Sequence, residues 1–133
     1  MSRTVITYGT FDMFHIGHLR LFKRMRELGE RVIVAVSTDE FNALKGKKAL
    51  VPYAERYEIV AAIQYVDLVI PERNWEQKAD DIRQYTVDCF VMGDDWRGHF
   101  DHLAALCEVI YLERTKDVSS TVLRQAADNF FSG

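Results

Sequence analysis

The amino-acid sequence predicts one α/β domain with a doubly wound, Rossmann-like sheet of five parallel strands in the order 3-2-1-4-5. Short apolar runs alternate with longer amphipathic runs, which is the pattern of repeated strand–helix units. The apolar runs contain few polar residues, as expected for strands covered on both faces. A length of 133 residues suits a single core, so we expect residues 1–133 to form one domain.

The chain begins with a strand, a helix and a second strand. Residues 5–8 are a short apolar run, and Arg31–Ser37 is a longer one. Between them, residues 14–28 have a helical pattern that stops before Gly29, a residue type common just after a helix. The apolar residues of this helix recur at helical spacing: Leu19, Phe22, Met25 and Leu28.

The middle of the chain continues the alternation. Thr38 or Asp39 can cap a helix directly after the second strand. Residues 53–65 form an amphipathic helical run, and residues 66–70 form the third strand. We expect Pro71 to end that strand, because proline cannot donate to a ladder.

The last third adds two strands. Asn74 and Trp75 open a helix over residues 76–85, and the fourth strand follows at residues 88–92. A short helix at 100–107 precedes the fifth strand, Glu108–Leu112. The polar run 119–121 is expected to cap a final helix over residues 122–130.

The segment between the first strand and the first helix has the features of a phosphate-binding loop. Gly9 and Gly17 allow backbone and ligand to approach closely. The start of a helix has unpaired N–H groups and a positive dipole end. His15 and His18 share one helix face, so both imidazoles can donate to one anion. A structural pair or zinc ligands are alternatives, but no third Cys or His lies nearby.

Two further basic features suggest anions. Lys45, Lys47 and Lys48 lie within four residues of a chain whose net charge is −3, so the loop is either solvated or a mobile clamp on a polyphosphate. We favour the clamp. Arg56 lies on the first turn of its helix, where the dipole opposes a cation, which suggests a nearby anion rather than a plain surface arginine.

These features are expected to meet in one crevice. In open α/β sheets, ligands bind outside the carboxyl ends of the strands at the switch point. The loop 93–98 should therefore face the loop 9–18, and Arg114 and Thr115 follow the fifth strand to the same edge. No dinucleotide fingerprint and no P-loop motif occur in the sequence.

The composition narrows the class of protein. An acidic chain is not an electrostatic binder of nucleic acid. No signal peptide and no membrane-spanning run are evident. Two cysteines in apolar runs, Cys89 and Cys107, suggest reduced thiols and a cytoplasmic protein.

Residues 8–18 read Tyr-Gly-Thr-Phe-Asp-x-x-His-x-Gly-His, the signature of the nucleotidyltransferases with an HxGH motif. The blocks Asn-Trp-Glu-Gln-Lys at 74–78 and Met-Gly-Asp-Asp-Trp at 92–96 are more specific. With them, the chain resembles the cytidylyltransferase family to about residue 125, and within it the enzymes that act on glycerol 3-phosphate. Other matching blocks lie at residues 37–42, 45–48, 65–67, 70–78 and 114–115. Gln64 departs from the family, which often has arginine there.

The resemblance implies transfer of CMP from CTP to sn-glycerol 3-phosphate, giving CDP-glycerol and pyrophosphate by direct in-line attack. A phosphomonoester is largely dianionic at neutral pH, so it needs no general base. The family uses CDP-glycerol to build polymers such as teichoic acids or capsules. It also uses Mg²⁺ or another divalent cation with CTP and forms homodimers. We expect the dimer contacts in residues 56–67 and 71–75.

The resemblance also implies roles for individual residues. Catalytic roles fall on His15, His18, Lys47 and Arg114. Contacts to CTP fall on Gly9, Thr10, Phe11, Lys45, Asp95, Trp96, Thr115 and Ser120; Asp94 and Asp95 cannot be separated on sequence alone. Asp39, Arg56, Asp67 and Trp75 are expected at the acceptor. Asp12 is expected to steer a histidine or a phosphate-bound Mg²⁺.

Three rival functions stay open at this point. One is a cytidylyltransferase with another acceptor, such as ethanolamine phosphate, choline phosphate or another polyol phosphate. A second is an adenylyltransferase that uses ATP, against which the block 92–96 argues. A third is a regulatory module that binds a nucleotide without turnover.

Overall fold

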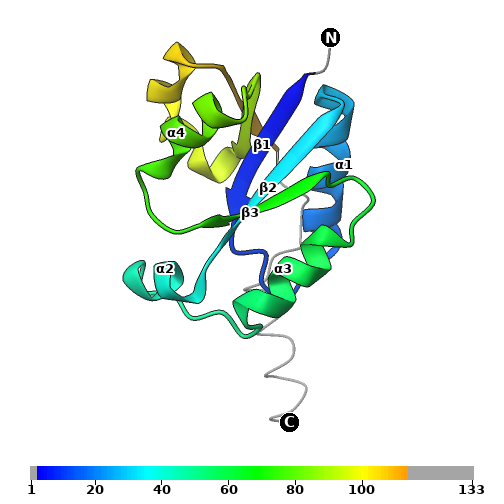
Figure 1. The fold of residues 1–133 in the computed structure, drawn as a ribbon, viewed down its shortest axis with the longest axis vertical. Coiled ribbons are helices and arrows are strands. Elements are labelled where there is room, and N and C mark those ends of the chain that lie inside the picture. The colour runs from blue at the N-terminus through cyan, green and yellow to red at the C-terminus, as the bar shows by residue number, and fades with distance from the viewer. Residues whose placement is uncertain (1–2, 114–133) are drawn as a thin grey trace.

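A computed structural model describes residues 3–113, and its centre is a five-stranded parallel sheet (Figure 1). The strand order is β3-β2-β1-β4-β5, so the predicted order is confirmed. The strands are β1 (Thr4–Gly9), β2 (Arg31–Ser37), β3 (Leu68–Glu72), β4 (Cys89–Gly93) and β5 (Glu108–Leu112). The chain turns back across the sheet between β3 and β4, so β1 and β4 flank the switch point.

The register brings the carboxyl ends of the strands to one edge. Gly9 pairs with Val36, and Ser37 pairs with Glu72 on the other side of β2. On the opposite half of the sheet, Gly93 pairs with Leu112. The loops that follow β1, β2, β3 and β4 therefore leave the sheet side by side.

Helices cover both faces of the sheet. They are α1 (Ile16–Leu28), α2 (Asp39–Leu44), α3 (Tyr53–Ala61) and α4 (Gln77–Gln84), with 3₁₀ turns η1 (Asp94–Trp96) and η2 (Asp101–Ala105). Side chains of α1 and α3 pack into one core cluster, and side chains of α4 and η2 pack into a second. Figure 1 shows α1 and α3 on one side of the strands and α4 on the other.

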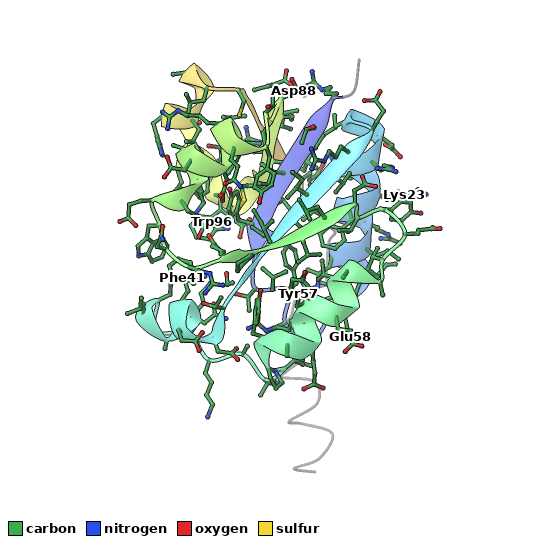
Figure 2. The ribbon with its side chains drawn as sticks, viewed as in Figure 1. Lys23, Phe41, Tyr57, Glu58, Asp88 and Trp96 are labelled. Carbon is green, nitrogen blue, oxygen red and sulfur yellow. The ribbon has the colours of Figure 1, made fainter. Side chains whose placement is uncertain are left out.

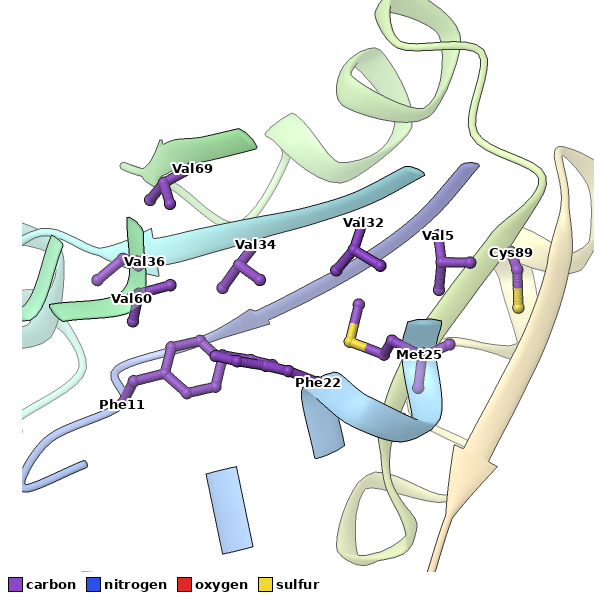
Figure 3. Close-up of a cluster of buried hydrophobic side chains, with 11 residues drawn as sticks. Val5, Phe11, Phe22, Met25, Val32, Val34, Val36, Val60, Val69 and Cys89 are labelled. Carbon is purple, nitrogen blue, oxygen red and sulfur yellow. The ribbon is translucent and has the colours of Figure 1, made fainter. Parts of the chain in front are cut away.

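The pleat of β2 divides its side chains between the two clusters. Val32, Val34 and Val36 face α1 and α3, where Phe22 and Met25 meet them (Figure 3). The intervening Ile33 and Ala35 face the second cluster. Both faces are buried, which explains why the strand sequence shows almost no polar alternation. The outer side of α1 carries polar residues such as Lys23, which points away from the sheet (Figure 2).

Several boundaries differ from the sequence expectations for local reasons. The first helix starts at Ile16 rather than residue 14, because His15 is its N-cap. The third strand extends to Glu72 and contains Pro71, which is tolerated because β3 is an edge strand. The helix expected over 53–65 ends at Ala61. The short helix expected at 100–107 is a 3₁₀ turn.

Gly29 closes α1 as predicted, but not through a left-handed conformation. Its backbone is extended, with φ of −166°. A Cβ at this position would lie 2.5 Å from the carbonyl oxygen of Arg3, so the glycine permits a close approach to the chain before β1. The final helix expected over residues 122–130 lies outside the described residues. Among residues 3–113, no helix has the length and apolarity needed to cross a bilayer.

Candidate active site

A cleft of about 840 Å³ opens at the carboxyl edge of the sheet. Its walls come from segments that are far apart in the sequence. They are Tyr8 to Asp12, His18, Lys45 to Ala49, Glu72, Trp75, Lys78, Met92, Asp95, Trp96, His99 and Phe100. The predicted meeting of the loop after β1 with the loop after β4 is therefore confirmed.

The two histidines of the first loop form a stacked pair at the start of α1. Their ring centroids are 3.8 Å apart, and the planes are inclined by 24°. Nδ1 of His15 accepts from the N–H of Gly17 at 3.0 Å, and Nδ1 of His18 accepts from the N–H of His15 at 3.2 Å. Together they form a capping box in which both polar side chains are imidazoles.

This cap fixes the tautomer of both rings. A ring nitrogen that accepts a hydrogen bond carries no proton, so a neutral imidazole must carry its proton on the other nitrogen. His15 and His18 therefore hold their protons on Nε2. The helix start thus turns two rings into a pair of N–H donors, and His18 lines the cleft.

His18 is surrounded by aromatic rings. Phe11 packs edge-on against it at 5.4 Å between centroids, and Phe14 lies at 5.3 Å. Burial and the neighbouring His15 lower the pKa of His18 to about 3, with Asp12 opposing the shift. The ring is therefore neutral at physiological pH, consistent with its role as acceptor in the cap.

The first loop carries backbone strain next to these rings. Phe11 and Met13 both have left-handed backbone conformations, with φ of 53° and 50°. Such angles are uncommon for residues with a side chain, and they concentrate at functional sites. The preceding Gly9 lets the Phe11 ring lie close to the backbone, because a Cβ there would lie 3.0 Å from that ring.

Asp12 ties the first loop to the lysine loop. Its Oδ2 accepts from the N–H of Leu50, and its Oδ1 accepts from the N–H of Val51, both at 2.9 Å. The residue is 3% exposed. Asp12 is thus a structural brace between two walls of the cleft, a role that the sequence did not indicate.

Asn42 makes a second tie at the other end of the lysine loop. Its carbonyl oxygen accepts from the N–H groups of Lys45 and Lys47, and its Oδ1 accepts from the hydroxyl of Thr10 at 3.1 Å. The loop is therefore held on the first loop at both ends. The predicted clamp is therefore anchored at its two ends, and its closure on a polyphosphate stays a prediction.

The two predicted phosphate lysines differ in their surroundings. Lys47 is exposed beside the cleft. Lys45 reaches inward, donates to Ser37 Oγ at 3.2 Å, and lies 4.5 Å above the ring of Phe41. Burial lowers the pKa of the Lys45 ammonium, and nearby Glu72 opposes that shift.

The floor of the cleft holds charged residues that sequence reasoning did not single out. Lys78 Nζ lies 2.9 Å from Glu72 Oε2, and Ser37 Oγ donates to Glu72 Oε1 at 2.6 Å. Beside them, the hydroxyl of Tyr8 donates to Asp81 at 2.7 Å. Lys78 lies inside the specific block 74–78, but nothing in that block reveals its partner across the sheet edge.

The loop after β4 separates the two neighbouring aspartates. Asp95 and Trp96 line the cleft, and the side chain of Asp95 folds back over Gly93. A Cβ on Gly93 would lie 2.7 Å from Asp95 Oδ1, so a larger residue at 93 would displace the Asp95 carboxylate. This geometry assigns the cleft-facing position to Asp95 rather than Asp94. Trp75, 55% exposed, faces the same cleft and packs against Phe41.

The structure corrects the expectation for Arg56 and shows which group pairs with it. Arg56 is 1% exposed and donates to the carbonyl oxygens of Val51, Thr10 and Ser37 and to Asp39 Oδ1. Asp39 also accepts from the N–H of Tyr53. The anion that the sequence argument required is therefore a protein carboxylate. Arg56 fastens the cleft walls together and is too buried to meet an acceptor, whereas the side chain of Asp39 is 52% exposed and its acceptor role stays a prediction.

Asp67 was also expected at the acceptor, and this is corrected too. It precedes β3, at the amino edge of the sheet, whereas the cleft lies at the carboxyl edge. Its carboxylate accepts from the N–H of Val32 at 2.8 Å and pairs with Arg26. The remaining predicted contacts, Arg114, Thr115 and Ser120, lie outside the described residues.

Comparisons with known proteins add to this geometry. The model of the cytidylyltransferase-like family matches residues 6–126. Glycerol-3-phosphate cytidylyltransferases of Staphylococcus aureus (strain NCTC 8325 / PS 47) and Bacillus subtilis (strain 168) are each 54% identical over 123 residues, which is 92% of this chain and 93% and 95% of theirs. An FAD synthase of Pyrococcus horikoshii is 36% identical over 68% of this chain and 62% of its own length.

Solved structures support the fold. The lipopolysaccharide core biosynthesis protein of Thermoplasma volcanium GSS1 superposes with a TM-score of 0.73, at 18% identity, over 87% of this chain and 100% of that one. A bifunctional NMN adenylyltransferase/ADP ribose pyrophosphatase of Francisella tularensis gives a TM-score of 0.69, at 18% identity, over 98% of this chain and 43% of that one.

Proposed function

Because the chain belongs to the cytidylyltransferase-like family, we propose that it transfers CMP from CTP to sn-glycerol 3-phosphate and releases CDP-glycerol and pyrophosphate. The observation that carries this proposal is the 54% identity to enzymes with that name over 92% of the chain. The cleft supports it, because its donors suit a polyphosphate and its floor and rim supply aromatic surface for a base.

The chemistry needs little from the protein beyond placement and charge. An oxygen of the acceptor phosphate attacks the α-phosphorus of CTP, and the bond from that phosphorus to the bridging oxygen breaks. Pyrophosphate leaves with the electron pair. The attacking phosphate is already ionised at neutral pH, so no general base is required. The protein aligns the two phosphates and stabilises the charge that develops between them.

The paired imidazoles are the donors best prepared for that charge. His15 and His18 carry Nε2–H groups whose direction is set by the helix cap. Donors fixed before the reaction need no rearrangement when the charge moves to the leaving oxygens. We assign both rings to the α-phosphate and the leaving group.

The other phosphate contacts are assigned by position. Lys47 and Lys45 reach the phosphates from the anchored loop, and the Gly9–Thr10–Phe11 turn offers its backbone. Arg114 is assigned to the transfer itself, and Thr115 and Ser120 to the terminal phosphates, by their match to the family motif. Asp95 is assigned to the cytosine amino group, since a carboxylate accepts from that group in base recognition, with Trp96 beside the ring.

A divalent cation is assigned to CTP rather than to a protein cage. Within residues 3–113, no cluster of three or more Cys, His, Asp or Glu is placed to hold a metal. Both oxygens of Asp12 accept from backbone N–H groups. Mg²⁺ is commonly held by substrate phosphates with few protein ligands. We therefore place Mg²⁺ on the phosphates, where it would neutralise part of their charge.

Two wider features complete the proposal. The chain forms a homodimer through residues 56–67 and 71–75, where Tyr57, Ile59 and Trp75 leave apolar surface exposed. Tyr57 and Glu58 are labelled on α3 in Figure 2. Sedimentation of the purified protein tests the proposed dimer.

The protein is assigned to the cytoplasm, a reducing compartment that suits its free thiols Cys89 and Cys107.

Pyrophosphate release tests the reaction. The purified protein is given CTP or ATP with glycerol 3-phosphate, ethanolamine phosphate, choline phosphate or another polyol phosphate. Release with CTP and glycerol 3-phosphate above all other pairs supports the proposal. If another phosphomonoester is preferred, glycerol 3-phosphate is not the acceptor. If ATP is preferred to CTP, the protein is an adenylyltransferase. CTP binding without release from any pair overturns the enzyme assignment in favour of a regulatory module.

The set of acceptors in this assay is needed because Gln64 stands where the family often has arginine. Gln64 is exposed and follows α3, away from the residues that line the cleft. An effect of this residue on the choice of acceptor would therefore not act through the described cleft walls. Gln64→Arg, measured with the same panel, tells whether the departure changes acceptor preference.

A further inference from the structure

The side chain of Asn42, which contacts the cleft residue Thr10, carries a hydrogen-bond donor that is not used. Asn42 is 2% exposed, and its Nδ2 has no hydrogen-bond partner among residues 3–113. No other buried side-chain nitrogen or oxygen in that part of the chain lacks a partner. A buried donor of this kind has lost its hydration and gained nothing in return. Its presence in the fold therefore calls for an explanation.

The remaining polar groups of Asn42 are all engaged. Its main-chain N–H donates to the carbonyl oxygen of Thr38, and its main-chain carbonyl oxygen accepts from the N–H groups of Lys45 and Lys47. Its Oδ1 accepts from the hydroxyl of Thr10 at 3.1 Å. The residue is therefore held in place, and a half-turn of its terminal amide would bring Nδ2 to the partner that Oδ1 has now.

The present hydrogen bond limits what the Thr10 hydroxyl can offer to a ligand. A hydroxyl carries one proton and two lone pairs. Thr10 lines the cleft, but its proton is donated to Asn42, so only lone pairs remain for a phosphate oxygen. Two acceptors in contact repel each other. In this arrangement the Thr10 hydroxyl therefore does not help to bind a nucleotide.

A half-turn of the Asn42 amide reverses the hydrogen bond. The last torsion of an asparagine side chain is broad and roughly twofold, and its oxygen and NH₂ group are similar in size. After the half-turn, Nδ2 donates to Thr10 Oγ1, and the hydroxyl proton can be donated elsewhere. The two side chains still share one hydrogen bond, so the free protein gains little. A bound phosphate adds a second, charge-assisted bond from the same hydroxyl.

We propose that Asn42 is a positioning residue whose amide turns when the nucleotide binds and so releases the Thr10 hydroxyl as a donor to a phosphate. The inference rests on the proposed function, because it takes the cleft as the CTP site. No proton is transferred between residues, since the hydroxyl proton only changes its acceptor from Asn42 Oδ1 to a phosphate oxygen. The nucleotide selects the turned amide, because only that state makes the additional bond.

A double-variant cycle tests the proposal through the affinity for CTP. Asn42→Asp keeps the shape of the side chain but can only accept when ionised, so it should hold the Thr10 proton permanently. Thr10→Val removes the hydroxyl and keeps the shape. Titration calorimetry with CTP and Mg²⁺ at about pH 8, without an acceptor, compares both variants, their combination and the wild type. The new charge at position 42 weakens binding in both backgrounds, so the test is the difference between them.

The expected affinities follow from the release of one donor. Thr10→Val should weaken CTP binding roughly tenfold, the lower end for a hydrogen bond to a charged group. Asn42→Asp should weaken it about tenfold more in the wild-type background than in Thr10→Val. Thr10→Ser restores a hydroxyl and should bind within about threefold of the wild type. Equal effects of Asn42→Asp in the two backgrounds, or wild-type affinity in Thr10→Val, would overturn the proposal, because the bond would then be a fixed structural tie.

Heteronuclear NMR of the wild type decides the matter if Asn42→Asp does not fold. The signals of the Asn42 side-chain amide are followed while CTP is added. The amide proton that begins to donate to Thr10 should move downfield, and the Thr10→Val protein should lack this change. Amide signals that stay unchanged when the wild type binds CTP would overturn the proposal.

Turnover separates this inference from the proposed function. If the wild type releases pyrophosphate but the affinities show no coupling between Thr10 and Asn42, the inference alone falls. If the wild type binds CTP but turns over no acceptor, the proposed reaction falls, and the affinities and the amide signals still test the role of Asn42.

Discussion

The two edges of the parallel sheet carry the same kinds of charged side chain and use them differently. At the amino edge, Asp67 and Asp88 accept from the N–H groups of neighbouring strands, and Arg26 pairs with Asp67 in a partly exposed bridge. At the carboxyl edge, Arg56 and Lys78 are buried, and they contact backbone carbonyls, carboxylates and aromatic rings. Buried charge marks the edge where the cleft lies.

Strained backbone occurs at both edges. Phe11 and Met13 adopt left-handed conformations next to the paired histidines. Strain and buried charge both cost free energy, and the surrounding structure must hold them in place. The amino edge has a left-handed residue of its own, Thr86 with φ of 51° in the turn before β4, so buried charge rather than strain separates the two edges. Substitutions at matched positions on the two edges should therefore differ in size and in kind.

The largest contrast is expected between two arginines. Arg56→Met removes the donor of four hydrogen bonds at the cleft and should lower the free energy of unfolding by about 3–5 kcal/mol. Arg26→Met at the other edge should cost about 1 kcal/mol or less, because its ion pair is partly exposed. Urea unfolding of both variants measures the difference. Equal losses would refute the contrast between the edges.

The next effect separates chemistry from folding. In His15→Asn, the new side chain can still cap α1, but the Nε2–H donor is lost. We expect kcat/KM for CTP to fall about 10²–10³-fold, with melting temperature nearly unchanged. His102→Asn, on the exposed η2 turn, is the matched control and should retain activity. A large fall in the melting temperature of His15→Asn would show that the main role of the His15 ring is structural.

A smaller effect is expected at the exposed lysine of the anchored loop. Lys47→Ala should lower kcat/KM for CTP by the equivalent of about 1.5–3 kcal/mol, the value of a charged hydrogen bond. The fall should come from a higher half-saturating CTP concentration or a lower turnover. Stability should change by no more than about 0.5 kcal/mol. Lys23→Ala, on the outer side of α1, should change neither quantity. If Lys47→Ala melts the fold, the loop is structural and the phosphate role is wrong.

The smallest effect concerns pH. The pKa of His18 is lowered in the folded protein from 6.5 to about 3. Below pH 6.5, the unfolded histidine binds a proton that the folded one excludes, so the stability present above this pH is lost progressively as the pH falls towards 3. His18→Gln should flatten this part of the stability profile, measured by urea unfolding from pH 7 to 5. An unchanged slope would mean that other groups control it.

The sequence predicted the strand order and the meeting of the loops after β1 and β4, because both follow from local patterns and their order along the chain. Strand and helix periods fix the alternation, and the handedness of parallel connections leaves few topologies. The histidine spacing predicted a shared helix face, and the structure adds that backbone N–H groups occupy both Nδ1 atoms. That detail depends on the cap conformation, which the spacing alone does not determine.

The errors have a common physical cause. The position of Arg56 on its helix indicated that an anion was needed, and Asp39 supplies it from within the protein. Asp67 was placed by a motif, while the direction in which its strand runs puts it on the other edge. Glu72 and Lys78 meet only after β3 and α4 have packed. A sequence shows which charges require partners, and tertiary packing decides where the partners come from.

Pro71 in β3 has a consequence for how copies of this chain can associate. An edge strand normally offers a row of N–H groups on which a foreign strand can assemble. Proline has no N–H, so the row is interrupted within β3, close to the cleft. Aggregation by sheet extension is thereby discouraged along this border. Any lasting self-association there must rely on side chains.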